Sequence, residues 1–370
     1  MRLYRALCIG ALVAAPRITT GQLPRSLSDS AFASLVARFS EPTGFFDTDN
    51  LISNEDSYLH PITTLRRVGV TGGVYVGVGP DQNFSYIAAI RPHAAVIIDI
   101  RRDNLLEHLL FKSIFAQSRN RVEYLAMLFG KPGPTDTTGW SAKHIDSVLA
   151  YVRRARATDA QLARIRANVA AEAARSGIAL SNVEIETIKR FHDAFIAEGP
   201  ALRFTSYGRA PSAGYPDFAQ LAAERDLEGR QRSWLATEDA FQFVKSLEDR
   251  NLIIPVVGNF AGPKAFGAVA QWMASNNEKL SALYASNVEQ YLTRDRLFDA
   301  FAANLLKLPR DSKSVIIRSC FNFCRAQHSH AVTNYYSVQM TQLVDTFAAL
   351  RASGRLVSYV DVVTLGLLPP

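Results

Sequence analysis

The sequence of 370 residues predicts an α/β fold, in which a doubly wound, mostly parallel sheet carries a helical insertion. Three observations support this fold class. Six short runs rich in β-branched and aromatic residues alternate with segments at helical spacing. Glycines end the first run and an aspartate lies near the end of the second. With 48% hydrophobic residues, the chain can also bury a substantial core.

The first strand, helix and second strand form a βαβ unit with a glycine turn. The predicted elements are a strand over 74–78, a helix over 83–91 and a strand over 94–100. Gly77 and Gly79 permit a tight turn with close backbone approach, and Asp99 ends the second strand. Asp99 follows Gly79 by 20 residues (99 − 79), which matches the roughly 20 expected between a ligand-binding turn and a carboxylate that accepts ribose hydroxyls. A purely structural turn, whose glycines serve only packing, is the alternative.

The remaining elements continue the alternation after a long helical interruption. Two loops are predicted from their Pro and Gly content, over 131–139 and over 207–217, and the second could cover a ligand pocket as a lid. An alanine-rich, charged stretch over 141–198 predicts the helical insertion, placed within about 131–250. The other predicted helices are 105–115, 122–129, 263–275, 294–306 and 335–351, and the other predicted strands are 252–257, 280–285, 314–317 and 356–363.

Polar side chains and glycines follow several of the predicted strands. Since ligands of open α/β sheets bind outside the carboxyl ends of the strands, these residues predict one shared site. They are Gly77, Gly79, Asp99, Asn259, Phe260, Asn287 and Glu289.

At these residues the chain resembles the class I S-adenosylmethionine-dependent methyltransferases, with VYVGVG as the glycine turn and Gly258-Asn259-Phe260 at the third strand. Segment by segment it is similar to an uncharacterised bacterial family recognisable by VGVGPDQNFSYIAAIRP, DIRRDNLLEH, GNFAGPKA and LYASNVEQYL, over most of residues 45–320. The resemblance implies a Rossmann-like fold and S-adenosylmethionine as cofactor, without naming a methyl acceptor.

The resemblance also suggests which residues act. It implies a cofactor site formed by Gly77, Gly79, Asp81, Gln82, Asn83, Asp99, Arg101, Asn259 and Phe260. Near the fourth strand, Asn287 and Glu289 are the candidates for orienting or deprotonating a substrate. Three positions depart from the superfamily pattern: Tyr75 and Asn259 stand where acids are common, and Asp81 where a third glycine of GxGxG would be.

The first 21 residues resemble an export signal. Arg2 and Arg5 precede an apolar run over 6–15, which is too short to span a bilayer. Cleavage would leave an N-terminal extension over 22–69 and a methyltransferase-type domain over 70–370, in an exported or periplasmic protein; otherwise the protein is cytoplasmic. Because S-adenosylmethionine is a cytoplasmic metabolite, the alternative is a non-catalytic exported protein that binds another ligand or a protein partner.

Other function classes are disfavoured by the sequence. The formal charge of +7 is partly carried by arginines of the helical insertion, which we interpret as a solvated helix face, so nucleic acid is an unexpected partner. Cys320, Cys324, His328 and His330 match no common zinc spacing, although the two cysteines could pair in an oxidising compartment. GxSxG and GxxxxGK[ST] are absent, and Gln82 in place of a third GxGxxG glycine disfavours a nicotinamide-dependent oxidoreductase.

Overall fold

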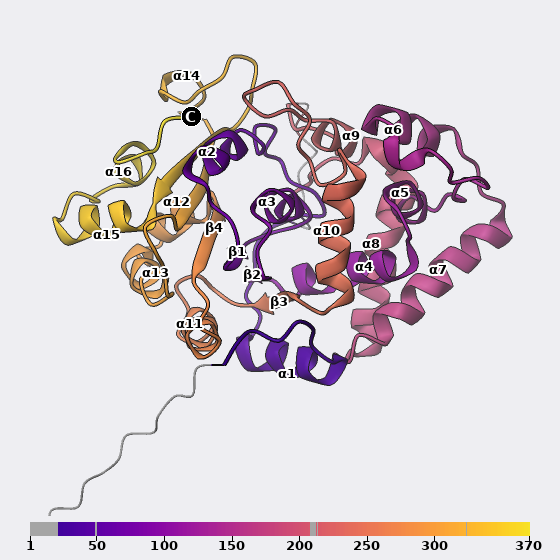
Figure 1. Cartoon of the computed structure of the whole chain (residues 1–370), viewed down its shortest axis with the longest axis horizontal. Helices are drawn as coiled ribbons and strands as arrows, with labels where there is room; N and C mark the ends of the chain where they lie inside the picture. The colour runs from indigo at the N-terminus through magenta and orange to yellow at the C-terminus, as the bar shows by residue number, and fades with distance from the viewer. Residues whose placement is uncertain (1–20, 49, 208–211, 213, 323) are drawn as a thin grey trace, which may run out of the picture.

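In the computed structural model, the described residues are 21–48, 50–207, 212, 214–322 and 324–370, and they form an α/β fold around a six-stranded sheet (Figure 1). The sheet order is β3-β2-β1-β4-β5-β6, with β6 antiparallel to β5 and the other neighbouring strands parallel. The predicted α/β class and mostly parallel sheet are therefore confirmed. The strands are β1 (Val74–Gly77), β2 (Ala94–Asp99), β3 (Ile253–Val257), β4 (Leu280–Ser286), β5 (Val315–Cys320) and β6 (Val338–Leu343).

The strands form where the sequence has short apolar runs without helical periodicity. All residues of β1, β2 and β3 are buried, as expected for parallel strands covered on both faces. Pro255 lacks a backbone N–H and lies in β3, which pairs with β2 alone and is an edge strand. Figure 1 shows α2, α3 and α10 on one side of the strands, and α1, α11 and α13 on the other.

The predicted helical insertion is helical and lies at one end of the molecule (Figure 1). Capping boxes begin three of its helices, at Thr158, Ser181 and Asp217, because each side chain bonds the backbone three residues on. The helices are α1 (Asp29–Phe39), α2 (Pro61–Val68), α3 (Gln82–Ile90), α4 (Arg102–Gln117), α5 (Arg121–Leu128), α6 (Ile145–Arg154), α7 (Asp159–Ala174), α8 (Asn182–Glu198), α9 (Phe218–Ala222), α10 (Glu238–Asp249), α11 (Ala265–Ser275), α12 (Val288–Arg294), α13 (Phe298–Leu305), α14 (Cys324–Gln327), α15 (Val344–Ala352) and α16 (Tyr359–Thr364), with short 3₁₀ helices over Trp140–Ala142 and Gly199–Ala201.

The prediction for the C-terminal region was wrong. The predicted helix over 335–351 contains β6 and then α15, and the predicted strand over 356–363 is largely α16. Strand β6 buries Gln339 and Gln342, which bond Glu55 and Arg318, so its sequence lacks the apolar pattern of a strand. Helix α16 begins with a capping box at Ser358, despite its β-branched residues. The predicted helix over 294–306 is also divided, at Arg296, where φ is +60°.

Helix α1 packs against the sheet. Helix α1 contacts β3 and α11, and Phe39 packs edge-to-face on Trp272 of α11 at 5.9 Å. The signal-like segment falls almost wholly on residues 1–20, which lie outside the described residues. Among the helices that are described, none has both the length and the apolarity that a bilayer crossing needs.

Candidate ligand-binding site

A cavity of about 260 Å³ lies at the carboxyl ends of β1, β2, β3 and β4. The strand order reverses between β1 and β4, the position at which open α/β sheets usually bind ligands. Another part of its wall comes from the N-terminal extension, through Phe45, Phe46, Thr48, Asn50, Ser53, Asn54 and Glu55. Of the predicted site residues, six line this cavity together with Gly258: Gly79, Gln82, Asp99, Arg101, Asn259 and Phe260, and the predicted catalytic Asn287 lines it as well.

The glycine turn is held from inside by Asn83. Its amide nitrogen donates to the carbonyls of Val78, Gly79 and Pro80 at 2.8–3.2 Å, and its oxygen accepts from Tyr75. Asn83 is thus committed to the turn rather than to a ligand. A Cβ on Gly77 would lie 2.0 Å from the Asn83 amide oxygen, so this glycine is required by packing. Gly79 has a φ of +83° and itself lines the cavity.

Gln82 lines the main cavity, whereas Asp81 does not. The Gln82 amide lies 3.4 Å from the Tyr284 hydroxyl. Asp81 lines a separate cavity of about 10 Å³ with Tyr58, Trp234 and, again, Gln82. Burial raises the pKa of the Asp81 carboxyl to about 7, which a bond from Trp234 only partly opposes. The structure therefore does not bring Asp81 to the predicted cofactor site.

Replacing Asp81 with Asn should raise the melting temperature by several degrees more at pH 8.5 than at pH 5. Because the folded pKa lies above the unfolded value, the folded state holds the Asp81 proton more tightly, and this stabilisation is lost as pH rises through about 7. Thermal denaturation of both proteins at the two pH values measures the difference. The lowered pKa values of His60 and His108, about 4 in each case, act in both proteins and cancel. An equal effect of the substitution at both pH values would contradict the assignment.

At the end of β2, Asp99 and Arg101 form a buried ion pair in the cavity wall. The Arg101 backbone N–H donates to Asp99 Oδ1 at 2.8 Å, and its guanidinium contacts both carboxylate oxygens at 3.1–3.2 Å. Arg101 also donates to the Thr48 carbonyl. A carboxylate has about four lone-pair positions, and these three bonds leave one for a ligand hydroxyl. Asp99 can therefore accept a hydroxyl without losing its arginine.

At the end of β3, Glu41 fixes the turn that carries Asn259 and Phe260. Its carboxylate accepts from the backbone N–H groups of Asn259, Lys264 and Ala265 at 2.7–3.1 Å. The Asn259 side-chain oxygen accepts a hydrogen bond from the backbone N–H of Ala261 at 2.9 Å. Phe260 is buried and stacks on Phe301 at 5.8 Å. This strand end is rigid, and it presents an amide and an aromatic edge to the cavity.

The two residues predicted as catalytic at the end of β4 are separated. Asn287 lines the cavity, but the Glu289 carboxylate is buried and forms an ion pair with Arg318. Glu289 and Arg318 are 1% and 0% exposed, and burial raises the pKa of Glu289 although Arg318 opposes it. Glu289 is absent from the described lining of the cavity, so the structure gives it a role in packing α12 on β5.

A different carboxyl, Glu55, lines the cavity at this position. It accepts from Ser286, from Ser319 at 2.7 Å and from Gln339 at 2.6 Å, and it also bonds Tyr284. Burial raises its pKa, which these bonds only partly oppose. Sequence patterns do not point to Glu55, because it lies in an aperiodic segment and its partners come from three distant strands.

The mouth of the cavity is aromatic. Phe46 meets Tyr291 edge-to-face at 5.0 Å, and Phe204 lines the same wall. Phe45 is 77% exposed, which is unusual for a large apolar side chain. Phe204 precedes the predicted lid; within that lid, residues 208–211 and 213 lie outside the described residues.

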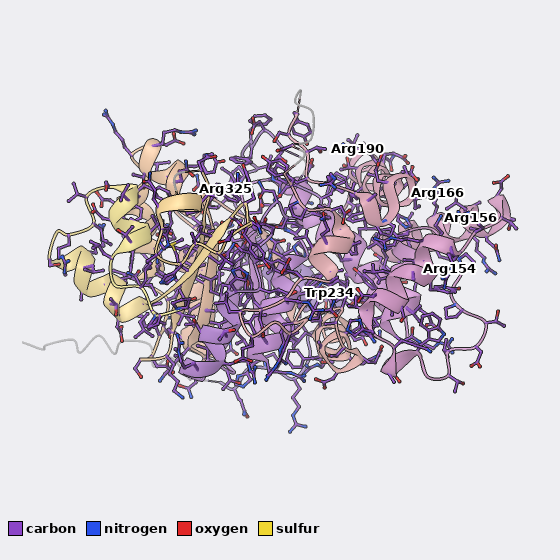
Figure 2. The ribbon with its side chains drawn as sticks, turned by 90° about the horizontal axis from the view of Figure 1, so that it is seen from above. Arg154, Arg156, Arg166, Arg190, Trp234 and Arg325 are labelled. Atoms are coloured by element: carbon purple, nitrogen blue, oxygen red, sulfur yellow. A yellow bond between two sulfur atoms is a disulfide. The ribbon has the colours of Figure 1, made fainter. Side chains whose placement is uncertain are left out.

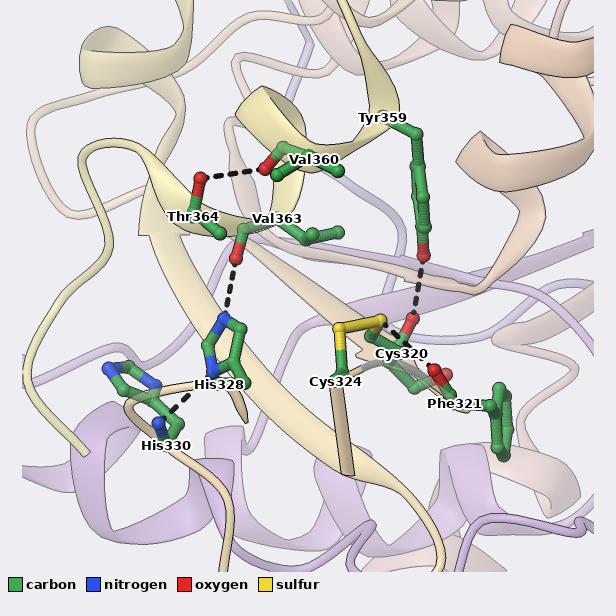
Figure 3. Close-up of a disulfide and its surroundings, with 10 residues drawn as sticks. Cys320, Phe321, Cys324, His328, His330, Tyr359, Val360, Val363 and Thr364 are labelled. Atoms are coloured by element: carbon green, nitrogen blue, oxygen red, sulfur yellow. Dashed lines mark hydrogen bonds between the residues drawn. A yellow bond between two sulfur atoms is a disulfide. The ribbon is translucent and has the colours of Figure 1, made fainter. Parts of the chain in front are cut away.

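The cysteine and histidine cluster, drawn in Figure 3, contributes no residue to the described lining of this cavity. Cys320 and Cys324 form a disulfide, and His328 accepts from the His330 N–H and contacts the Val363 carbonyl at 2.7 Å. Within the described residues, no group of three or more His, Cys, Asp and Glu side chains is arranged to hold a metal ion. The CxxxCxxxHxH pattern is thus used for a covalent link and for backbone contacts.

The arginines of the insertion lie on its surface, away from the sheet (Figure 2). Figure 2 shows Arg154, Arg156 and Arg166 toward one end of the molecule, with Arg325 toward the other. Arg166 pairs with Asp193 at 2.7 Å, and Arg156 donates to carbonyls at the end of α6. These contacts agree with a solvated, locally paired helix face.

A family model described as Domain of unknown function (DUF7790) matches residues 51–362 of the chain. The match covers more than half of the sequence, and it includes all six strands of the sheet and most of the residues that line the cavity. No curated protein matches the chain. The activity must therefore be argued from the cavity and its side chains.

Proposed function

We propose that this chain, which belongs to the family described as Domain of unknown function (DUF7790), is an S-adenosylmethionine-dependent methyltransferase. The observation that carries the proposal is the single cavity at the reversal of strand order. It joins the Gly79 turn, the Asp99 carboxylate, and Asn259 with Phe260 from three adjacent strand ends. Helices on both sides of this sheet also support a doubly wound, Rossmann-like arrangement.

The residues present fit a nucleoside with a short charged tail. Asp99 has a lone-pair position left for a ribose hydroxyl, and Asn259 with Phe260 offers an amide and an aromatic edge for a base. The cavity volume lies close to the lower end of the range of about 300–1,000 Å³ for small-ligand sites. Bound S-adenosylmethionine would supply an already activated methyl group, and the protein would supply position.

Two features favour this cofactor over a dinucleotide. The Gln82 side chain lies against the Gly79 turn, at the N-terminus of α3 where a pyrophosphate would bind. In addition, β6 runs antiparallel to β5, whereas dinucleotide-binding sheets of order 3-2-1-4-5-6 are mostly parallel.

Isothermal titration calorimetry tests the proposal directly. We expect the purified protein to bind S-adenosylhomocysteine with a Kd of about 1–100 µM, within the usual range for enzyme substrates. NAD serves as the control and should give no heat. If neither S-adenosylmethionine nor S-adenosylhomocysteine gives heat at millimolar concentration, the proposal is wrong.

A second candidate is a non-catalytic exported protein with the same fold that binds another ligand or a protein partner. The Cys320–Cys324 disulfide favours it, because disulfides persist mainly in oxidising compartments. The N-terminal sequence of the mature protein and its cell fraction discriminate the two candidates. An intact Met1 in the cytosolic fraction would remove this one.

A further inference from the structure

Glu55 is fully buried, yet it lies at the wall of the cavity where β4 ends. Donors surround its carboxylate: Ser286 and Ser319 bond one oxygen, Gln339 bonds the other, and the Tyr284 hydroxyl also reaches the group. Since a carboxylate has about four lone-pair positions, these donors occupy them. A ligand can therefore exchange a proton with Glu55 only through one of these side chains.

Ser286 is the partner of Glu55 that can reach a ligand. It lines the cavity, its hydroxyl donates to Glu55, and its oxygen can still accept a hydrogen bond. Its φ of +50° is uncommon for a residue other than glycine, and such backbone strain is concentrated at functional sites. The helix α12 follows two residues later, so the turn after β4 is sharp. Ser286 thus connects the cavity to the buried carboxyl.

The surrounding wall favours a neutral, aromatic molecule. Arg294 pairs with Asp295 at 2.7 Å and Asp99 pairs with Arg101, so these four charges of the described wall cancel in pairs. Glu55 is a further acidic side chain of the described wall, and it is buried with bonds to both carboxylate oxygens. Phe46 and Tyr291 supply flat apolar surface beside Asn287 and Ser286. Aromatic rings bind to such surfaces edge-to-face or in offset stacks.

We propose that the β4 end of the cavity is a methyl-acceptor subsite, which binds a neutral aromatic molecule whose hydroxyl group donates a hydrogen bond to Ser286. This inference rests on the proposed function. As the acceptor oxygen forms its bond to the methyl carbon, the bond between that carbon and the sulfonium sulfur breaks and leaves a neutral thioether. The acceptor proton passes to Ser286 Oγ while the Ser286 proton passes to Glu55. Ser286 contacts the substrate, and Glu55 acts through it.

Binding of 4-methylphenol and of toluene, measured by ligand-observed NMR, tests the subsite without requiring turnover. The two probes differ by one hydroxyl, so their affinity ratio reports the hydrogen bond to Ser286. We expect the wild-type protein to prefer 4-methylphenol by about tenfold. Ser286→Ala and Ser286→Gly should abolish the preference, and Glu55→Gln should reduce it by about threefold because a neutral amide accepts more weakly than a carboxylate. Toluene affinity should change little in these variants. An unchanged toluene affinity shows that the cavity has not collapsed, so that a lost preference reports the loss of the hydrogen bond.

Ser281→Ala is the matched control, because Ser281 is also buried on β4 but does not belong to the described cavity lining. It should keep the tenfold preference. Equal affinity of the two probes in the wild type, or a full preference in both Ser286 variants, would overturn the subsite. S-adenosylhomocysteine binding measured on the same samples is independent: its absence removes the methyltransferase proposal, and its presence with no hydroxyl preference removes only the subsite.

Discussion

Replacing Glu289 with Ala is expected to lower the free energy of unfolding by about 3–5 kcal/mol. Glu289 and Arg318 are almost fully buried, and Arg318 donates to Glu289 and, at 2.9 Å, to the amide oxygen of Gln342. Removing the carboxylate leaves the guanidinium buried without a counter-charge, which costs far more than the loss of a surface pair. Urea denaturation measures the change.

Glu186→Ala provides the control for this prediction. Glu186 pairs with Lys189 on the surface of α8, where the two side chains are 68% and 45% exposed. Its loss should cost less than about 1 kcal/mol. If Glu289→Ala were as mild as this control, the charge of Arg318 would have to be compensated by some other group. Replacing both Glu289 and Arg318 with apolar residues should recover much of the lost stability.

Replacing Asp99 with Ala is expected to weaken S-adenosylhomocysteine binding by about 1–3 kcal/mol, or roughly 5- to 150-fold. The carboxylate is the group placed to accept a ribose hydroxyl, and it also holds Arg101 in the cavity wall. Calorimetry gives the affinity, and a melting curve shows that the variant is folded.

Asp103→Ala is the matched control for Asp99. Asp103 lies in the first turn of α4, outside the described cavity lining, and pairs weakly with Arg190 at 4.0 Å. Its loss should leave the affinity unchanged. Unchanged affinity in a folded Asp99 variant would count against a role for this carboxylate in ribose binding.

The sequence could predict the first five strands because each is a short apolar run that belongs to a buried parallel sheet. It could not predict β6, since the polar residues of that strand are buried against Glu55 and Arg318, and such pairing over long separations leaves no local pattern. The ends of β1 and β2 that face the cavity were predictable from the spacing between Gly79 and Asp99, and the end of β3 from Gly258-Asn259-Phe260 after its apolar run. Asp81 and Glu289 were predicted as site residues because they follow the ends of β1 and β4. Their side chains turn away from the cavity, because a position after a strand end does not fix the direction of a side chain.

The bonds of Glu55 also have a consequence for the order in which the protein matures. The partners Ser286, Ser319 and Gln339 follow Glu55 by 231, 264 and 284 residues. A ribosome delivers Glu55 early and these partners late, so the β4 end of the cavity can close only when nearly the whole chain has been synthesised. A nascent or truncated chain that stops before β6 would lack Gln339, which donates to the second oxygen of Glu55. The set of hydrogen bonds to Glu55 is therefore complete only after β6 has been synthesised.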